Sequence, residues 1–349
     1  PLSLQLLGTM AAGLPASLLM KRIGRTKGFL LGTLLGALGG VVSAWAIMAE
    51  NFTLFCLGIL LLGLMRGFTQ LYRFSAIDVV PAHFKPRAIS LVLAGGILAG
   101  FLGPEIGSCR VEWIPDHRFA GSYWAVVVLF LISIPMLLLV RLPGPSGEEQ
   151  TGKTRSLAEI SRSPVFLVAL LSSCVSYGVM SLIMTATPLS MKSFSHGVSD
   201  TALVIQWHVV GMFAPSFFTG SLIERFGHLR IMATGLLLNL FCIVVNLIGQ
   251  GLLNYWSALL LLGIGWNFMF VTGTSMLTET YSPAEKAKVQ GFNDLLVFAT
   301  AAAFSLLAGV LQHWGGWIWV NLYCLPFLVI TGMLLIWYRT RKVEEAEPA

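Results

Sequence analysis

The chain reads as a series of long apolar stretches separated by short polar segments. A helix needs about 20 apolar residues to cross the hydrocarbon core of a bilayer. Eleven stretches approach that length, at residues 4–20, 28–48, 52–73, 88–108, 121–141, 165–189, 200–223, 229–249, 256–278, 289–311 and 316–338. The strict alternation of apolar and polar residues that marks strands of a membrane barrel is absent. The pattern therefore predicts an all-α, polytopic membrane protein.

The positions of the basic residues orient these stretches. Only 11% of the chain is charged, its mean hydropathy is +0.80, and its net charge is +6. Lys and Arg gather in short cytoplasmic loops of membrane proteins. Placing the loop after the first stretch inside puts 18 of the 22 Lys and Arg residues, Arg73 among them, in the cytoplasm, three outside, and Arg66 within the membrane. This topology accounts for the net charge without a nucleic-acid partner and makes the C-terminus cytoplasmic.

The longest polar interruption, residues 142–163, is rich in Pro, Gly and charge and is typical of a linker. A short surface helix is expected within it, around Leu157 to Ile160. We predict an N-terminal bundle at 1–140, a cytoplasmic linker at 141–164, a C-terminal bundle at 165–338 and a cytoplasmic tail at 339–349. The chain starts without Met inside an apolar run, so we expect a truncated first bundle. One further helix would turn five plus six spans into six plus six.

A short polar pattern occurs twice, each time after an apolar stretch. It runs from Ser17 to Arg25 and again from Gly220 to His228, with its Arg and Gly positions 203 residues apart. A second pair of loops, Asp78 to Pro81 and Glu279 to Pro283, repeats at an offset of 202 for the prolines. Repeats at this distance predict two pseudo-symmetric helical bundles, as in many secondary transporters.

The repeated pattern resembles the loop motif G-x-x-x-[D/E]-R-x-G-[R/K] of the major facilitator superfamily. The resemblance implies a set of gating residues: Arg22, Gly24, Arg25, Gly220, Glu224, Arg225 and Gly227. The first copy departs from the family pattern, because Ser17 stands in place of Gly and Lys21 in place of the acid. We therefore expect the acidic partner that docks this loop to be missing from the first half. In the second half, Glu224 with Arg225 supplies it.

Two further stretches resemble the same family. Arg66 matches the buried arginine of the fourth family helix, and Gly103, Pro104 and Gly107 resemble a Gly-Pro motif associated with antiporters. Glu105 departs from that motif. The resemblance implies an exporter that exchanges its solute for protons.

Ionisable residues at membrane depth cost several kcal/mol and are functional candidates. Arg66 could bind an anionic group or relay a proton, or it could extend its long side chain to the interface. His208 shares a helical stripe with Val204, Gly211 and Pro215, where it could couple protons, contact substrate or serve as a neutral hydrogen-bonding residue between helices. Asp294 and Glu279 lie near the inner ends of their spans, where a solvated or loop-docking role is expected.

Uncharged polar and aromatic residues within the spans indicate an amphipathic substrate. The candidates for substrate contact besides Arg66 and His208 are Tyr177, Gln206, Trp207, Trp266 and Asn267. The alternative for each of them is packing against lipid or another helix.

Together these observations favour a monomeric, proton-coupled transporter of a small organic solute that works by alternating access, in a plasma membrane such as the bacterial inner membrane. Export of a drug or metabolite is the first hypothesis. Proton-coupled uptake of an organic anion is the second, and a transporter-like receptor or scaffold is the third. An enzyme is not expected, because the six His and five Cys residues are scattered without ligand spacing, so no metal or cofactor is predicted.

Overall fold

The structure, a computed structural model, describes residues 2–109, 114, 117, 119–140, 142–144 and 152–344, without the side chains of residues 2, 104–109 and 342–344. Every regular element in these residues is a helix, which confirms the all-α prediction. The first elements are α1 (Leu2–Ile23), α2 (Arg25–Met48), α3 (Phe52–Thr69), α4 (Tyr72–Ala76), η1 (Ile77–Val79), η2 (Ala82–Phe84), α5 (Lys85–Ala94), α6 (Gly96–Cys109) and α7 (Ala120–Leu139). The later elements are α9 (Leu157–Ile160), α10 (Pro164–Ser193), α11 (Val198–Phe213), α12 (Ser216–Phe226), α13 (His228–Ile248), α14 (Leu252–Leu277), η3 (Pro283–Glu285) and α15 (Lys286–Glu344). The short helix expected in the linker is present as α9.

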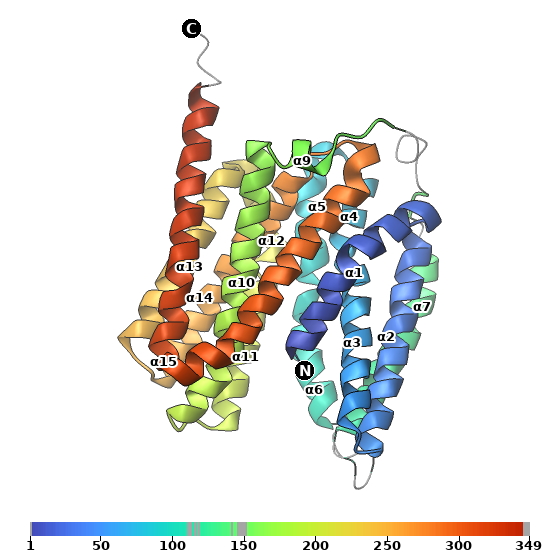
Figure 1. The fold of residues 1–349 in the computed structure, drawn as a ribbon, viewed down its shortest axis with the longest axis vertical. Coiled ribbons are helices and arrows are strands. Elements are labelled where there is room, and N and C mark those ends of the chain that lie inside the picture. The colour runs from blue at the N-terminus through green and yellow to red at the C-terminus, as the bar shows by residue number, and fades with distance from the viewer. Residues whose placement is uncertain are drawn as a thin grey trace. The chain divides into compact units, whose positions relative to one another are not determined.

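Within the described residues, ten helical segments are long and apolar enough to cross a membrane. The last of them, Pro283–Arg341, has 59 residues and a non-helical backbone at Gly316, where φ is 67°. A straight helix of that length would measure about 88 Å at 1.5 Å per residue, far more than a bilayer. The chain reverses direction at this point (Figure 1). The segment therefore supplies the last two of the eleven predicted stretches.

Glycine ends both copies of the repeated pattern in the same backbone conformation. Gly24, between α1 and α2, has φ 89° and ψ 159°, and Gly227, between α12 and α13, has φ 81° and ψ 160°. This region of backbone space is open essentially to glycine alone. The two glycines therefore turn the chain in the same way at equivalent points of the two halves, which extends the sequence repeat to the backbone.

The described helices form two compact units, each built from more than one segment of the chain. The first unit comprises residues 1–79, 98–155 and 282–302. Here α2 packs against α3 and α7, and α1 packs against α3. Glycines allow the close approach of α1 and α3: a Cβ atom at Gly63 would lie 2.4 Å from the carbonyl oxygen of Gln5.

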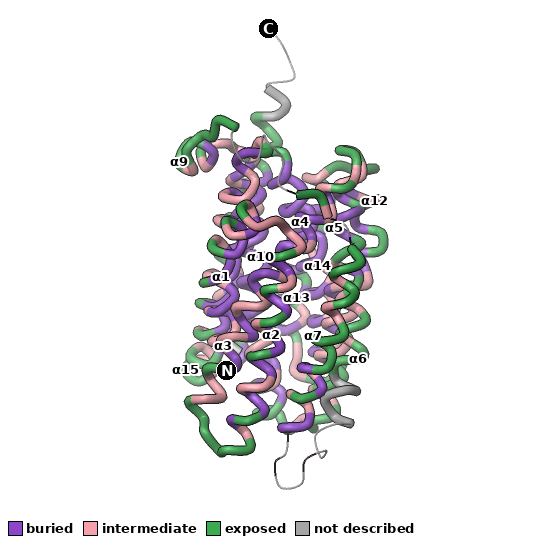
Figure 2. The backbone as a smooth tube through the Cα atoms, turned by 90° about the vertical axis from the view of Figure 1, so that its right-hand side faces the viewer, coloured by how far each residue is buried: buried purple, intermediate pink, exposed green. Residues whose placement is uncertain are grey.

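The second unit comprises residues 80–97, 156–281 and 303–349. Its central helix is α14, which packs against α10, α11 and α13, while α12 packs against α5. Both α10 and α14 are buried almost all round, whereas α7 of the first unit is largely exposed (Figure 2). Helices buried on every side carry their polar groups in the protein interior, so α10 and α14 are the natural places to look for a substrate site.

Each unit contains a helix segment from the other half of the predicted repeat. Residues 282–302, from the C-terminal half, belong to the first unit, and residues 80–97, from the N-terminal half, belong to the second. The predicted division at 1–140, 141–164, 165–338 and 339–349 stays a prediction. The two exchanged segments define two places where the halves touch inside a unit, and both lie beside the repeated loop pattern.

Candidate gating interfaces and substrate site

The second copy of the repeated pattern lies against α5, and we call the contact of α12 with α5 the second interface. A Cβ atom at Gly220 would lie 2.5 Å from the Cα of Arg87, so only glycine fits here without a shift. Glu224 forms an ion pair with Arg87 at 2.8 Å. The hydroxyl of Ser90 donates to the carbonyl of Ser216 and accepts the backbone N–H of Gly220 at 3.1 Å. Gly220 and Glu224 thus occupy the predicted gating positions in direct contact with α5.

Arg225 takes a different position from the one expected. It is exposed, and its guanidinium lies 5.2 Å from the centre of the Phe226 ring. The basic partner of Glu224 is therefore Arg87, which is far away in sequence, and not its neighbour Arg225. Adjacent residues on a helix point about 100° apart, which explains why the sequence pair does not form an ion pair.

The first copy of the pattern lies against η3 and the start of α15, and we call this contact of α1 the first interface. The hydroxyl of Ser17 donates to the carbonyl of Ala287 at 2.8 Å. A Cβ atom at Gly291 would lie 2.9 Å from the Cα of Leu14, so the small residue here is on α15. Lys21, in the place of the family acid, donates to the carbonyl of Ala284 at 3.1 Å.

An acid does serve the first interface, which corrects the expectation that it is missing. Asp78, in η1, lies 3.6 Å from the Arg25 guanidinium and 2.7 Å from the ammonium of Lys286. Arg25 also donates to the side-chain oxygen of Gln290 at 3.0 Å. The acid of this interface comes from η1 and not from position 21 of the loop motif. The motif alone does not show this, because Asp78 lies outside it. Arg22, another predicted gating residue, is exposed.

The linker is fastened to the first interface through Arg155. Its guanidinium donates to both carboxylate oxygens of Glu285, at 2.9 and 2.7 Å, and its backbone N–H donates to the same residue at 2.7 Å. The ammonium of Lys288 donates to the carbonyl of Arg155. Glu285 also accepts the backbone N–H of Ser282, which caps η3. The sequence predicts only a linker here, because nothing in the residues around Arg155 indicates that its partner is Glu285.

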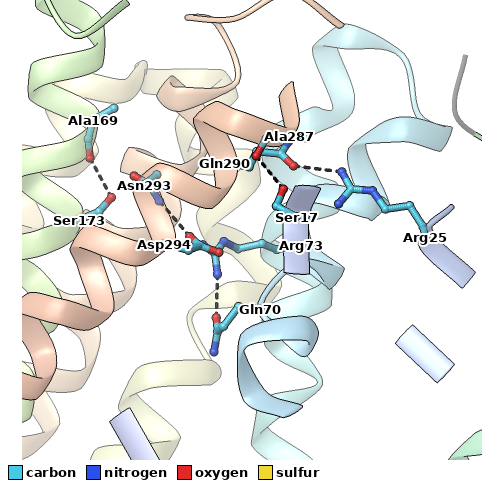
Figure 3. Close-up of polar contacts among 10 residues, drawn as sticks. All are labelled: Ser17, Arg25, Gln70, Arg73, Ala169, Ser173, Ala287, Gln290, Asn293 and Asp294. Atoms are coloured by element: carbon cyan, nitrogen blue, oxygen red, sulfur yellow. Dashed lines mark hydrogen bonds and ion pairs between the residues drawn. The ribbon is translucent and has the colours of Figure 1, made fainter. Parts of the chain in front are cut away.

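The most deeply buried ion pair of the described residues joins Arg73 in α4 to Asp294 in α15 (Figure 3). Both side chains are 1% exposed. Arg73 also donates to the side-chain oxygen of Gln70 at 2.7 Å, and Asn293 donates to Asp294 at 3.0 Å. Neither side chain is therefore solvated, contrary to the expectation for a loop position of Arg73 and to the solvated alternative for Asp294. Arg73 ends the predicted stretch 52–73 and Asp294 lies inside the stretch 289–311, but no local pattern shows that the two side chains meet.

Arg66, the arginine that sequence reasoning had placed in the membrane, is half-buried in α3. In the part of the chain that the structure describes, its guanidinium has no hydrogen bond or ion pair. Arg66, Gln70 and Arg73 follow one another at helical spacings of four and three, so this spacing was the available signal for Arg73. A substrate or proton role for Arg66 stays a prediction.

Four aromatic side chains gather in the second unit. Trp266 stacks on Phe270 with ring centres 5.0 Å apart, and the edge-to-face contacts of Tyr177 with them measure 5.3 and 5.1 Å. Phe213 of α11 completes this aromatic cluster at 6.0 Å from Trp266. The indole N–H of Trp266 is buried and has no hydrogen-bond partner among the described residues. Tyr177 and Trp266, two predicted contact residues, thus lie side by side.

The other predicted contact residues lie apart from this cluster or have structural partners. Trp207 is 42% exposed and meets Trp256 edge to face at 5.6 Å, and Gln206 is half-buried beside it in sequence. Asn267 is fully buried, and it donates to the carbonyl of Met212 at 2.6 Å and accepts from Thr219 at 2.7 Å. Asn267 therefore fixes α14 against the break between α11 and α12.

His208 is fully buried, as its helical stripe indicated. Its Nδ1–H donates to the carbonyl of Leu259 at 2.8 Å, and Nε2 has no partner within the described ranges. A Cβ atom at Gly263 would lie 2.5 Å from the carbonyl oxygen of His208, so α11 and α14 cross at close range here. This geometry gives the imidazole a structural hydrogen bond, and its role in coupling or substrate contact stays a prediction.

The antiporter-like motif lies in α6. Gly103 faces open space, and Pro104 and Gly107 fall among the residues whose side chains are outside the description. An export role that rests on these residues stays a prediction.

The helical fold, the repeat and the paired interfaces together define a secondary transporter that is integral to the membrane. The family model of the Major Facilitator Superfamily matches residues 1–206 and 169–349, so the chain belongs to this family and is not an enzyme. It is 43% identical over 340 residues to the riboflavin transporter RfnT of Brucella anthropi, covering 96% of this chain and 85% of that protein.

Two solved structures share the fold. The fucose:proton symporter FucP of E. coli has a TM-score of 0.75 at 18% identity, covering 97% of this chain and 89% of that one. The proton:xylose symporter XylE has a TM-score of 0.77 at 13% identity, covering 95% of this chain and 84% of that one. At such identities the likeness extends to the fold alone.

Proposed function

We propose that this protein moves riboflavin, or a flavin with the same ring system, across the plasma membrane by alternating access. The observation that carries the proposal is the 43% identity to a riboflavin transporter over nearly the whole chain. Alternating access requires two halves that rock around a central site. The two interfaces beside the repeated loops supply contacts that such a motion would make and break.

The aromatic cluster supports a flavin as the cargo. The isoalloxazine ring of riboflavin is flat, heteroaromatic and lined with hydrogen-bond donors and acceptors. Aromatic stacking contributes about 0.5–1.5 kcal/mol per ring pair beyond the burial of area. Tyr177, Trp266 and Phe270 offer ring faces of this kind, and the N–H of Trp266 is available as a donor within the described surroundings. We infer that a flavin inserts beside Trp266 when the cluster opens.

Uptake is the direction we propose, because riboflavin is a vitamin that cells take up as a precursor of flavin coenzymes. Export in exchange for protons is the second candidate, and the resemblance of Gly103, Pro104 and Gly107 to an antiporter motif favours it. Proton coupling belongs to both candidates. The two are separated by the direction in which an imposed proton gradient concentrates the solute.

The test is the movement of riboflavin, followed by its own fluorescence, in liposomes that contain the purified protein. We expect saturable transport. When the liposome interior is made more alkaline than the outside, protons flow inward, and a symporter should concentrate riboflavin inside. A folded protein that moves no riboflavin in either direction would overturn the proposal and favour the receptor or scaffold hypothesis. Accumulation in the opposite compartment would establish export.

Replacing the central indole sharpens this test. We expect Trp266→Ala to raise the KM for riboflavin about tenfold, because it removes a stacking face and a buried donor. The matched control is Trp207→Ala, which removes the same side chain from an exposed position in α11. Equal effects of the two substitutions on KM would show that the aromatic cluster is not part of the substrate site.

A further inference from the structure

The buried pair of Arg73 and Asp294 joins the two halves of the repeat inside the first unit. Arg73 comes from α4, in the N-terminal half, and Asp294 from the first part of α15, in the C-terminal half. Each side chain is 1% exposed. Removing one member of a buried ion pair leaves the other charge uncompensated in a medium that solvates it poorly. A motion that separates these two segments would produce the same uncompensated charges.

The two carboxylate oxygens of Asp294 differ in their surroundings. Oδ1 accepts from the guanidinium of Arg73 and from the side-chain amide of Asn293. Oδ2 is buried and has no hydrogen-bond partner among the residues that the structure describes. An acceptor without a partner is unfavourable in the interior, and a proton bound there removes the negative charge. Oδ2 is therefore the atom of this pair that is placed to receive a proton.

Arg73 keeps other partners when Asp294 is neutral. Its Nη1 donates to Gln70, and its guanidinium carbon lies 4.6 Å from the centre of the Phe74 ring. A hydrogen bond to an amide oxygen and a cation–π contact both stabilise a guanidinium. The arginine can thus stay charged in the N-terminal half after the carboxylate has lost its charge.

The other charged groups around Asp294 have partners of their own. On α1, the residue against the backbone of Asp294 is Gly13, and Lys21 donates to a backbone carbonyl. Arg25 of α2 and Lys286 of α15 both pair with Asp78 of η1. Further charged groups on these segments are Arg22 of α1, Lys27 of α2, Arg66 of α3 and Lys288 of α15, which donates to the linker, and Glu285 of η3, which pairs with Arg155. Arg73 is thus the charged side chain bonded to Asp294.

From this arrangement we infer that Asp294 is the proton-binding residue of the transport cycle and that its protonation releases Arg73 so that the first interface can open. In the closed interface the carboxylate is ionised and bonded to Arg73. When Oδ2 takes up a proton, the pair becomes a neutral acid beside a guanidinium, and the attraction between the halves falls. After the interface opens, Asp294 releases the proton to water and is again a carboxylate that Arg73 can bind. Arg73 is a positioning residue in this cycle.

The test compares two kinds of riboflavin transport by Asp294→Asn in liposomes, so its cargo rests on the proposed function. Counterflow exchanges labelled for unlabelled riboflavin and needs no proton gradient, whereas accumulation does. We expect the variant to lose accumulation driven by a pH gradient by about tenfold or more while its counterflow stays within about threefold of wild type. The matched control is Asp200→Asn, which makes the same substitution at a carboxylate that accepts the backbone N–H of Gly197 at the start of α11, outside both interfaces, and should keep both activities.

Accumulation by Asp294→Asn at the wild-type level would overturn the inference, as would an equal loss in Asp200→Asn. Accumulation driven by a sodium gradient and abolished by Asp294→Asn would assign the site to sodium and would also overturn the inference.

Arg73→Gln gives a second measurement if Asp294→Asn does not fold. Without the guanidinium the acid binds a proton more readily, so the pH of half-maximal accumulation should rise, and an unchanged profile would contradict the inference. Failure of wild-type counterflow would instead refute riboflavin as the cargo.

Discussion

The two interfaces are built on the same plan. In each, a glycine with positive φ turns the chain after the repeated pattern, at Gly24 and at Gly227. The next residue is a base that faces an acid from another segment: Arg25 lies 3.6 Å from Asp78 of η1, and His228 lies 3.7 Å from Glu279, in the turn after α14. These pairs occupy matching positions of the repeat. The frame of the interface is thus retained in both halves.

The packing residues of the two interfaces have changed sides. In the second interface the glycine, Gly220, is on the pattern helix and the serine, Ser90, is on the opposing helix. In the first interface the serine, Ser17, is on the pattern helix and the glycine, Gly291, is on the opposing helix. Each interface therefore has one small residue for close approach and one hydroxyl that bonds across it. What is retained is the pair, and not the residue type at one position.

The charges differ more than the packing. Glu224 bonds directly across the second interface to Arg87, and a cavity of about 530 Å³ lies beside it, lined in part by Lys85, His228 and Glu279. The first interface has Lys21 instead and receives its acids from η1 and η3. Two of its ion pairs, Asp78 with Lys286 and Glu285 with Arg155, measure 2.7 Å, and the second of them reaches into the linker. A departure from the family motif can thus be compensated by residues outside the motif.

The largest expected effect comes from filling the space at Gly220. A Cβ atom there would lie 2.5 Å from the backbone of Arg87, so Gly220→Ala should destabilise the protein by about 1–3 kcal/mol and nearly abolish transport. The control is Gly309→Ala, because Gly309 has open space around it. Thermal unfolding and riboflavin transport would be measured for both. Tolerance of Gly220→Ala would show that the second interface is not tightly packed.

A smaller effect is expected from Asp78→Asn in the first interface. The substitution removes the anion that faces both Arg25 and Lys286, so we expect about a fivefold lower turnover with an unchanged KM. Its counterpart, Glu279→Gln, should change turnover less than twofold, because Glu279 is 56% exposed and faces a histidine. Steady-state transport kinetics measure both values. If Glu279→Gln has the larger effect, the contrast drawn between the two interfaces is wrong.

The ion pair of the second interface should contribute less. We expect Glu224→Gln to lower turnover about two- to threefold, since the pair with Arg87 is partly exposed. Arg225→Ala should leave turnover unchanged, because Arg225 rests on Phe226 and not on Glu224. A double charge reversal, Glu224→Arg with Arg87→Glu, should restore turnover. Equal losses of turnover in Glu224→Gln and Arg225→Ala would instead support the expectation from the sequence that Glu224 acts together with Arg225.

The smallest effect is expected from Ser17→Gly, which restores the family residue. It removes the hydrogen bond to Ala287 and adds flexibility to α1, so stability should fall by about 1 kcal/mol with transport within twofold. Thermal unfolding of the purified protein measures the loss. An increase in stability would show that the hydroxyl contributes nothing to the first interface.

Much of the fold was accessible from the sequence because it depends on local patterns. Apolar length gives the spans, and the glycines at 24 and 227 are visible in the repeat. The partners across the interfaces were not accessible, because Ser90, Gly291 and Asp294 have no local feature that marks them as contacts. Arg73 was misplaced for the same reason: its burial depends on an acid 221 residues away. Tyr177 and Trp266 were predicted individually, and only folding shows that their rings touch.

The central claim is that the first interface must open for riboflavin to cross. A Cβ atom at Gly291 would lie 3.1 Å from the Cβ of Ser17, close to the roughly 3.5–4.5 Å that a disulfide requires. The direct measurement is riboflavin transport by the double variant Ser17→Cys with Gly291→Cys, oxidised and then reduced, beside Ser17→Cys alone. We predict that oxidation stops transport in the double variant only and that reduction restores it. Undiminished transport by the cross-linked protein would contradict the claim.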